Sequence, residues 1–175
     1  MTEQADKKTT VLVVDDDRLL HGAAGAAEPL LHIEGIVARG LGDLARAKAQ
    51  FFRARERTAA AVKEQPDDAR ILMVLGQIDA ALGRKEDAIR EGERAMELLP
   101  LSKDAVAGGL LVDKLARIYA QAADPARALI FLESAAKVPN GPNYGSLKLE
   151  DDWDALRSDA RFEKIVASLA PKGPK

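Results

Sequence analysis

Residues 69–100 read ARILMVLGQIDAALGRKEDAIREGERAMELLP, and this stretch decides the fold. Its apolar residues recur at spacings of three and four, which predicts two amphipathic helices joined at Gly83 and ended by Pro100. Small residues on both segments let the two helix backbones approach closely: Gly76, Ala88, Gly92 and Ala95. The stretch therefore predicts a tight antiparallel helical hairpin.

The hairpin pattern recurs on both sides. The upstream copy has a turn at Gly42-Asp43 and the downstream copy has one at Asp124-Pro125. Equivalent small residues recur at intervals of 41 and 40 positions: Gly35, Gly76 and Ala116 in the first helices, and Ala47, Ala88 and Ala128 in the second helices. A lone hairpin cannot bury both of its faces, so copies at one period are expected to stack into a solenoid.

The residues of the three copies resemble the tetratricopeptide repeat (TPR) family. The middle copy has the family's pattern of apolar, leucine-glycine, alanine, alanine and proline positions, but it has Asp79 where the family has an aromatic residue. The third copy has Tyr119 at that place. The resemblance implies an all-α, TPR-like solenoid of about three helical hairpins followed by a C-terminal capping helix.

The domain boundaries follow from this pattern. We expect TPR-like repeats over 28–139, divided into 28–66, 67–101 and 102–139, with a loop and capping helix over 140–175. Residues 138–150, VPNGPNYGSLKLE, predict a loop because they hold two prolines and two glycines. We expect helix to return after them around a cap at Ser158-Asp159. The period exceeds 34 residues partly because the second helix of the first copy, expected over 44–63, is about two turns longer.

The N-terminal region is expected to be a disordered arm over 1–10 and a cap over 11–27. The run VLVVDDD at 11–17 resembles the first strand of response-regulator receiver domains. The phospho-accepting aspartate and the further strands of a receiver do not follow, since the chain reads FFRARERT about forty residues on. The alternative is a short helix over 18–27 with the acids at its positive end.

Composition excludes several classes of function. The 26 basic and 28 acidic residues nearly balance, so we expect no nucleic acid or membrane partner. No apolar run reaches the ~20 residues of a membrane span, and MTEQADKKTT lacks the apolar part of a signal peptide, which favours a cytoplasmic chain or an excised domain. The absence of cysteine excludes disulfides, thiolate metal sites and thiol catalysis.

No catalytic, cofactor or metal motif is present. The chain has no P-loop, GxGxxG, GxSxG, HExxH or kinase signature, and its two histidines, His21 and His32, are 11 positions apart on different expected helices. We therefore expect a non-catalytic protein without cofactor or metal.

The TPR resemblance implies a concave groove, lined by the first helix of each hairpin, that binds a partner protein or peptide. Carried over by position, the lining residues are His32, Arg39, Arg70, Met73, Gln77, Asp113, Arg117 and Gln121. The lysines and asparagines with which chaperone-binding members hold a terminal carboxylate are not reproduced. Three arginines, Arg39, Arg70 and Arg117, would suit an acidic partner, although solvated surface charges explain them equally well.

Two other functions stay open. Residues 144–169 resemble the tails that follow TPR arrays in bacterial multidomain serine/threonine kinases and related signalling regulators, so the chain is alternatively a regulatory or sensory segment of a larger signalling enzyme. Prolines usual in such tails are replaced here by Asp151, Ala155 and Ala160. The remaining alternative is a structural spacer without a specific ligand.

Overall fold

The computed structural model describes residues 27–100, 102, 107–138 and 141–171. These residues form eight α-helices and one 3₁₀ helix, and the described ranges contain no strand, which confirms the expected all-α class. The elements are α1 (Ala27–Gly40), α2 (Leu44–Glu64), α3 (Ala69–Ala81), α4 (Lys85–Leu98), α5 (Ala107–Gln121), α6 (Pro125–Ala135), α7 (Tyr144–Leu149), η2 (Asp151–Leu156) and α8 (Ala160–Ser168). The expectations for residues 1–26, the receiver-like run among them, lie outside the described residues.

The chain divides into two compact units, one up to Arg57 and one from Thr58 onward, with the boundary inside α2. In the first unit, α1 and the first part of α2 form a hairpin. A β-carbon placed on Gly35 would lie 2.6 Å from a ring carbon of Phe51, so only glycine lets the two helices approach this closely. Ala47 on α2 is also buried. The small residues predicted to lie inside this hairpin therefore do so.

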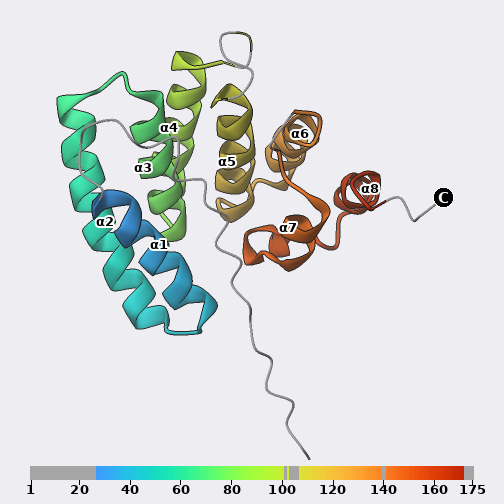
Figure 1. Ribbon diagram of the computed structural model, residues 1–175, viewed down its shortest axis with the longest axis horizontal. Coiled ribbons are helices and arrows are strands. Elements are labelled where there is room, and N and C mark those ends of the chain that lie inside the picture. The colour runs from blue at the N-terminus through green and yellow to red at the C-terminus, as the bar shows by residue number, and fades with distance from the viewer. Residues whose placement is uncertain (1–26, 101, 103–106, 139–140, 172–175) are drawn as a thin grey trace, which may run out of the picture. The chain divides into compact units, whose positions relative to one another are not determined.

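In the second unit, the hairpins α3–α4 and α5–α6 pack side by side (Figure 1). Gly76 on α3 faces the backbone of α4, since a β-carbon there would lie 3.0 Å from the Ala88 carbonyl oxygen. Gly92 on α4 faces α5, where an added β-carbon would meet Leu115 at 2.8 Å. Close helix packing thus depends on small residues both within the α3–α4 hairpin and between neighbouring hairpins.

All three hairpins have the same turn. After α3, the backbone N–H groups of Leu82, Gly83 and Arg84 donate to the carbonyls of Ile78, Ala80 and Asp79. The turns after α1 and α5 repeat these bonds at equivalent positions. Each turn places one residue in the left-handed region, namely Gly42 (φ 79°), Gly83 (φ 75°) and Ala123 (φ 63°). These residues are spaced by 41 and 40 positions, so the period of the sequence is also a period of backbone geometry.

The helix ends agree with the capping residues in the sequence. The Asp68 carboxylate accepts from the N–H groups at the start of α3, and the Asp124 carboxylate accepts from Arg127 N at the start of α6, with Pro125 following it. Helix α2 has 21 residues against 14 for α4, which confirms the two extra turns. The third hairpin was expected to begin near Ser102, but residues 103–106 are outside the described ranges and α5 is described from Ala107.

The predicted loop over 138–150 is wrong in its second half, where α7 forms. Asn143 and Ser146 make a capping box, in which the Asn143 side chain accepts from Ser146 N and the Ser146 hydroxyl accepts from Asn143 N. Leu147 is completely buried, so tertiary packing also holds this six-residue helix. The expected capping helix is likewise divided into η2 and α8, and Asp159 caps α8 as predicted.

The core of the second unit runs from α3 to α8. Its hydrophobic cluster contains small residues of the hairpins, such as Ala88, Ala116 and Ala128, together with large residues of the C-terminal segment, such as Trp153 and Phe162. Trp153 is the only tryptophan and has no exposed surface. Residues 141–171 are therefore an integral part of the second unit.

Candidate functional site

The two candidate residues of the first hairpin lie on α1. The His32 ring packs against the Phe51 ring at 6.0 Å between centroids, and Arg39 lies half-buried in the last turn of α1. His32 is thus part of the hairpin's packing.

The candidates on α3 have unequal access to solvent. Arg70 is exposed in the first turn, and Gln77 is half-buried two turns later. Met73 has no exposed surface and belongs to the core cluster. The prediction that Met73 lines the groove is therefore wrong, because tertiary packing covers its side chain. In this structure, Arg70 and Gln77 are the α3 candidates with accessible surface.

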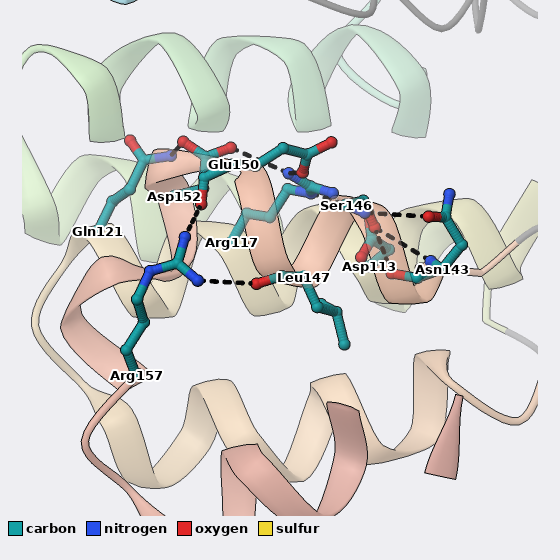
Figure 2. Close-up of polar contacts among 9 residues, drawn as sticks. All are labelled: Asp113, Arg117, Gln121, Asn143, Ser146, Leu147, Glu150, Asp152 and Arg157. Carbon is teal, nitrogen blue, oxygen red and sulfur yellow. Dashed lines mark hydrogen bonds and ion pairs between the residues drawn. The ribbon is translucent and has the colours of Figure 1, made fainter. Parts of the chain in front are cut away.

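The candidates on α5 contact the chain's own C-terminal segment (Figure 2). Arg117 Nη1 donates to Glu150 Oε2 at 2.5 Å and to Asp152 Oδ2 at 3.0 Å, while its Nε donates to Asp113 Oδ2 at 2.9 Å. Gln121 Nε2 donates to Asp152 Oδ1 at 3.0 Å. The structure therefore joins Asp113 to Arg117, and the carboxylates that Arg117 and Gln121 meet, those of Glu150 and Asp152, belong to the same chain.

The Arg117 guanidinium is largely buried between three carboxylates and an aromatic ring. Its side chain is 15% exposed, and its central carbon lies 4.8 Å from the centre of the Trp153 ring. Burial acts to lower the pKa of Arg117, but the charges of Asp113, Asp152 and Glu150 outweigh it, so the pKa is raised and the cation is stabilised. Arg117 is thus matched by three carboxylates and offers no unpaired guanidinium to an acidic partner.

A second arginine, Arg157, makes hydrogen bonds within this segment. Arg157 donates from Nη1 to the Leu147 carbonyl at 3.1 Å and from Nη2 to the Glu150 carbonyl at 3.0 Å. These carbonyls lie at the C-terminal end of α7, where a cation is favourable. Arg157 therefore joins the end of α7 to η2, and Arg117 joins both to α5.

The packing of the C-terminal segment over this face of α5 was not predicted from the sequence. The signal was present in the run EDDW, 150–153, because carboxylates directly before a tryptophan can pair with an arginine while the indole is buried beneath it. What the sequence does not supply is the distance of 33 positions between Arg117 and Glu150, which only the folded chain closes.

A second group missed by sequence reasoning lies inside the α3–α4 hairpin. Asp79 is fully buried and pairs with Arg84 Nε at 3.1 Å, and Glu91 is 9% exposed. Burial, followed by the charge of Asp79, raises the pKa of the Glu91 carboxyl to about 7. Asp79 stands at the position where the TPR pattern has an aromatic residue, so two acids replace apolar packing here.

The described residues contain no group of three His, Cys, Asp or Glu side chains arranged to hold a metal ion. Within the described ranges, no helix combines the length and apolar character needed to cross a membrane. No protein-family model matches the chain, and no curated protein is significantly similar to it.

Proposed function

We propose that the chain is a TPR-like helical-hairpin module that binds a partner protein or peptide and performs no catalysis. The observation that carries the proposal is the turn repeated at intervals of 41 and 40 positions, with small buried residues at equivalent places in each hairpin. Stacked hairpins with this construction present the first helix of each pair along one side, and proteins built in this way use such surfaces for binding.

The accessible candidates define where the partner would bind. On α5 the chain's own segment covers Arg117, so a partner does not have access to that side chain. On α3, Arg70 is exposed and Gln77 is partly accessible; on α1, His32 and Arg39 are half-buried. A partner with acidic groups that reach Arg70 is the one that these residues favour.

The test compares partner capture by the wild-type chain, Arg70→Glu and Arg53→Glu. Arg70 lies in the first turn of α3, where an acidic residue is compatible with the helix dipole, so Arg70→Glu is expected to fold. Arg53 is an exposed arginine on α2 and serves as the matched control. Quantitative mass spectrometry should show one partner reduced at least fivefold with Arg70→Glu and unchanged with Arg53→Glu. Equal recovery with all three baits contradicts binding through Arg70.

A further inference from the structure

A shallow groove lies between α6 and α8, on elements that carry none of the candidate binding residues described above. Its volume is about 440 Å³ and it is open to solvent. The lining residues recur at steps of three and four from Leu129 on α6 to Lys137, two residues past the end of that helix, and from Arg161 to Ser168 on α8. Each wall is therefore one face of a helix about two turns long.

The groove has an apolar floor and, beside the floor, one strongly exposed apolar side chain. Leu129 and Ile165 are nearly buried at 4% and 9% exposure, whereas Ile130 on the α6 side is 62% exposed. An exposed isoleucine beside an apolar floor gives a partner side chain a surface to bury.

The rim of the groove carries excess positive charge. Lys137 is paired with Glu133 and Arg161 is paired with Asp159, so two of its three cations are matched. Lys164 pairs with no carboxylate anywhere in the described part of the chain. A ligand that covers the apolar floor would thus place the groups on either side of its apolar stripe next to the unpaired Lys164 and near the exposed side chains of Lys137 and Arg161.

We infer that the groove between α6 and α8 binds an acidic amphipathic helix of a partner protein. Two helical walls meeting at an apolar floor are shaped to take a third helix, whose side chains at i, i+3 or i+4, and i+7 fill the space between them. Carboxylates beside that apolar stripe would face Lys164 and the rim, which favours an acidic helix over a neutral or basic one.

Two designed helical peptides of 18 residues provide the test. Both carry the same leucine stripe; one has glutamates and the other has lysines at the flanking positions. Binding to the full chain is followed by fluorescence anisotropy of a dye on the peptide. The acidic peptide should bind at least tenfold more tightly than the basic one, and its affinity should fall as salt is added.

Matched variants locate the binding. Ile130→Asp and Lys164→Glu alter exposed side chains of the groove and should each weaken binding of the acidic peptide at least tenfold. Their controls, Leu149→Asp and Lys148→Glu, introduce the same new residues at exposed positions of α7 and should leave binding unchanged. Circular dichroism of each variant verifies that the helices are retained.

Three results would overturn the inference: no binding of the acidic peptide, equal affinity for both peptides, or equal weakening by groove and control variants. Self-association of the wild-type chain that Ile130→Asp abolishes, measured by analytical ultracentrifugation, would instead assign the groove to a second copy. This surface is separate from Arg70, so loss of peptide binding here and loss of partner capture there are independent outcomes.

Discussion

At the scale of single residues, the three turns show how one β-carbon affects the strain of a left-handed backbone conformation. Gly42 and Gly83 reach the left-handed region without strain, but Ala123 has a β-carbon that opposes the same conformation. The third turn keeps its geometry because the rest of the hairpin imposes it.

Ala123→Gly is therefore expected to stabilise the protein by about 0.5–1 kcal/mol, the relief of strain being partly offset by the greater freedom of glycine in the unfolded chain. Gly83→Ala should destabilise it by about 1 kcal/mol. No atom lies within 4 Å of a β-carbon placed on Gly83, so conformation alone is tested. Urea unfolding followed by circular dichroism measures both changes. A loss of stability in Ala123→Gly would contradict the inference that the left-handed conformation of Ala123 is strained.

The buried carboxyl of Glu91 makes stability depend on pH. Its pKa is raised from 4.5 to about 7, so between these values the folded protein keeps a proton that the unfolded chain has lost. The stabilising effect of that proton is fully present below pH 4.5 and is lost as the pH rises through about 7.

Glu91→Gln should remove this dependence. It is expected to be as stable as the wild type near pH 4.5 and more stable by roughly 2 kcal/mol at pH 8, because glutamine carries no charge to desolvate. The measurement is the free energy of unfolding in urea at a series of pH values. Glu97→Gln, an exposed change on the same helix, is the control. Parallel pH profiles of stability for the wild type and Glu91→Gln would contradict the conclusion that the Glu91 carboxyl causes the pH dependence.

At the scale of the elements, two glycines control different contacts. Gly76 lies against backbone atoms of α4, which cannot move without shifting the helix, whereas Gly92 lies against the methyl ends of Leu115 and Ile118, which can rotate away. Both glycines lie inside helices, where alanine gains about 1 kcal/mol of helix propensity.

Gly76→Ala should therefore destabilise the protein by about 1–2 kcal/mol, since overpacking against backbone exceeds the gain in helix propensity. Gly92→Ala should change stability by less than about 1 kcal/mol, because the two effects nearly cancel. Thermal unfolding of the two variants side by side ranks them. If Gly92→Ala is the more damaging substitution, the α3–α4 contact is not the tighter one.

At the scale of the whole molecule, the C-terminal segment completes the second unit. Without residues 141–171, the face of α5 around Arg117 and the core residues that Trp153 covers would be exposed to water. The segment is held by buried aromatic surface and by one arginine shared among three carboxylates.

Arg117→Met should destabilise the protein by about 3 kcal/mol, because it removes the buried cation that Asp113, Glu150 and Asp152 share. Arg117→Lys should lose less, since the charge is kept while the forked contacts are not. The fluorescence of Trp153, the only tryptophan, reports unfolding of this segment directly. Arg161→Met, at an exposed ion pair, is the control and should change little. If Arg117→Met and Arg161→Met had equal stabilities, the cluster would have no role in holding the segment.

Patterns of short range were sufficient to predict most helices and their ends. The turn at Asp124-Pro125, the cap at Asp159 and the longer second helix of the first hairpin all depend on residues a few positions apart, where helix geometry converts spacing directly into contact. The residues of the α7 capping box, Asn143 and Ser146, are also only three positions apart in the sequence, although the neighbouring glycines and prolines favoured the prediction of a loop.

The sequence by itself determined an all-α chain of repeated hairpins, because the spacing of apolar and small residues specifies helices and the faces that they bury. Only the tertiary structure decided the state of the candidate binding residues. Met73 is buried, Arg117 is neutralised by Glu150 and Asp152, and Arg70 remains exposed. The reason is that exposure depends on which distant segment packs over a residue, and no local spacing contains that information.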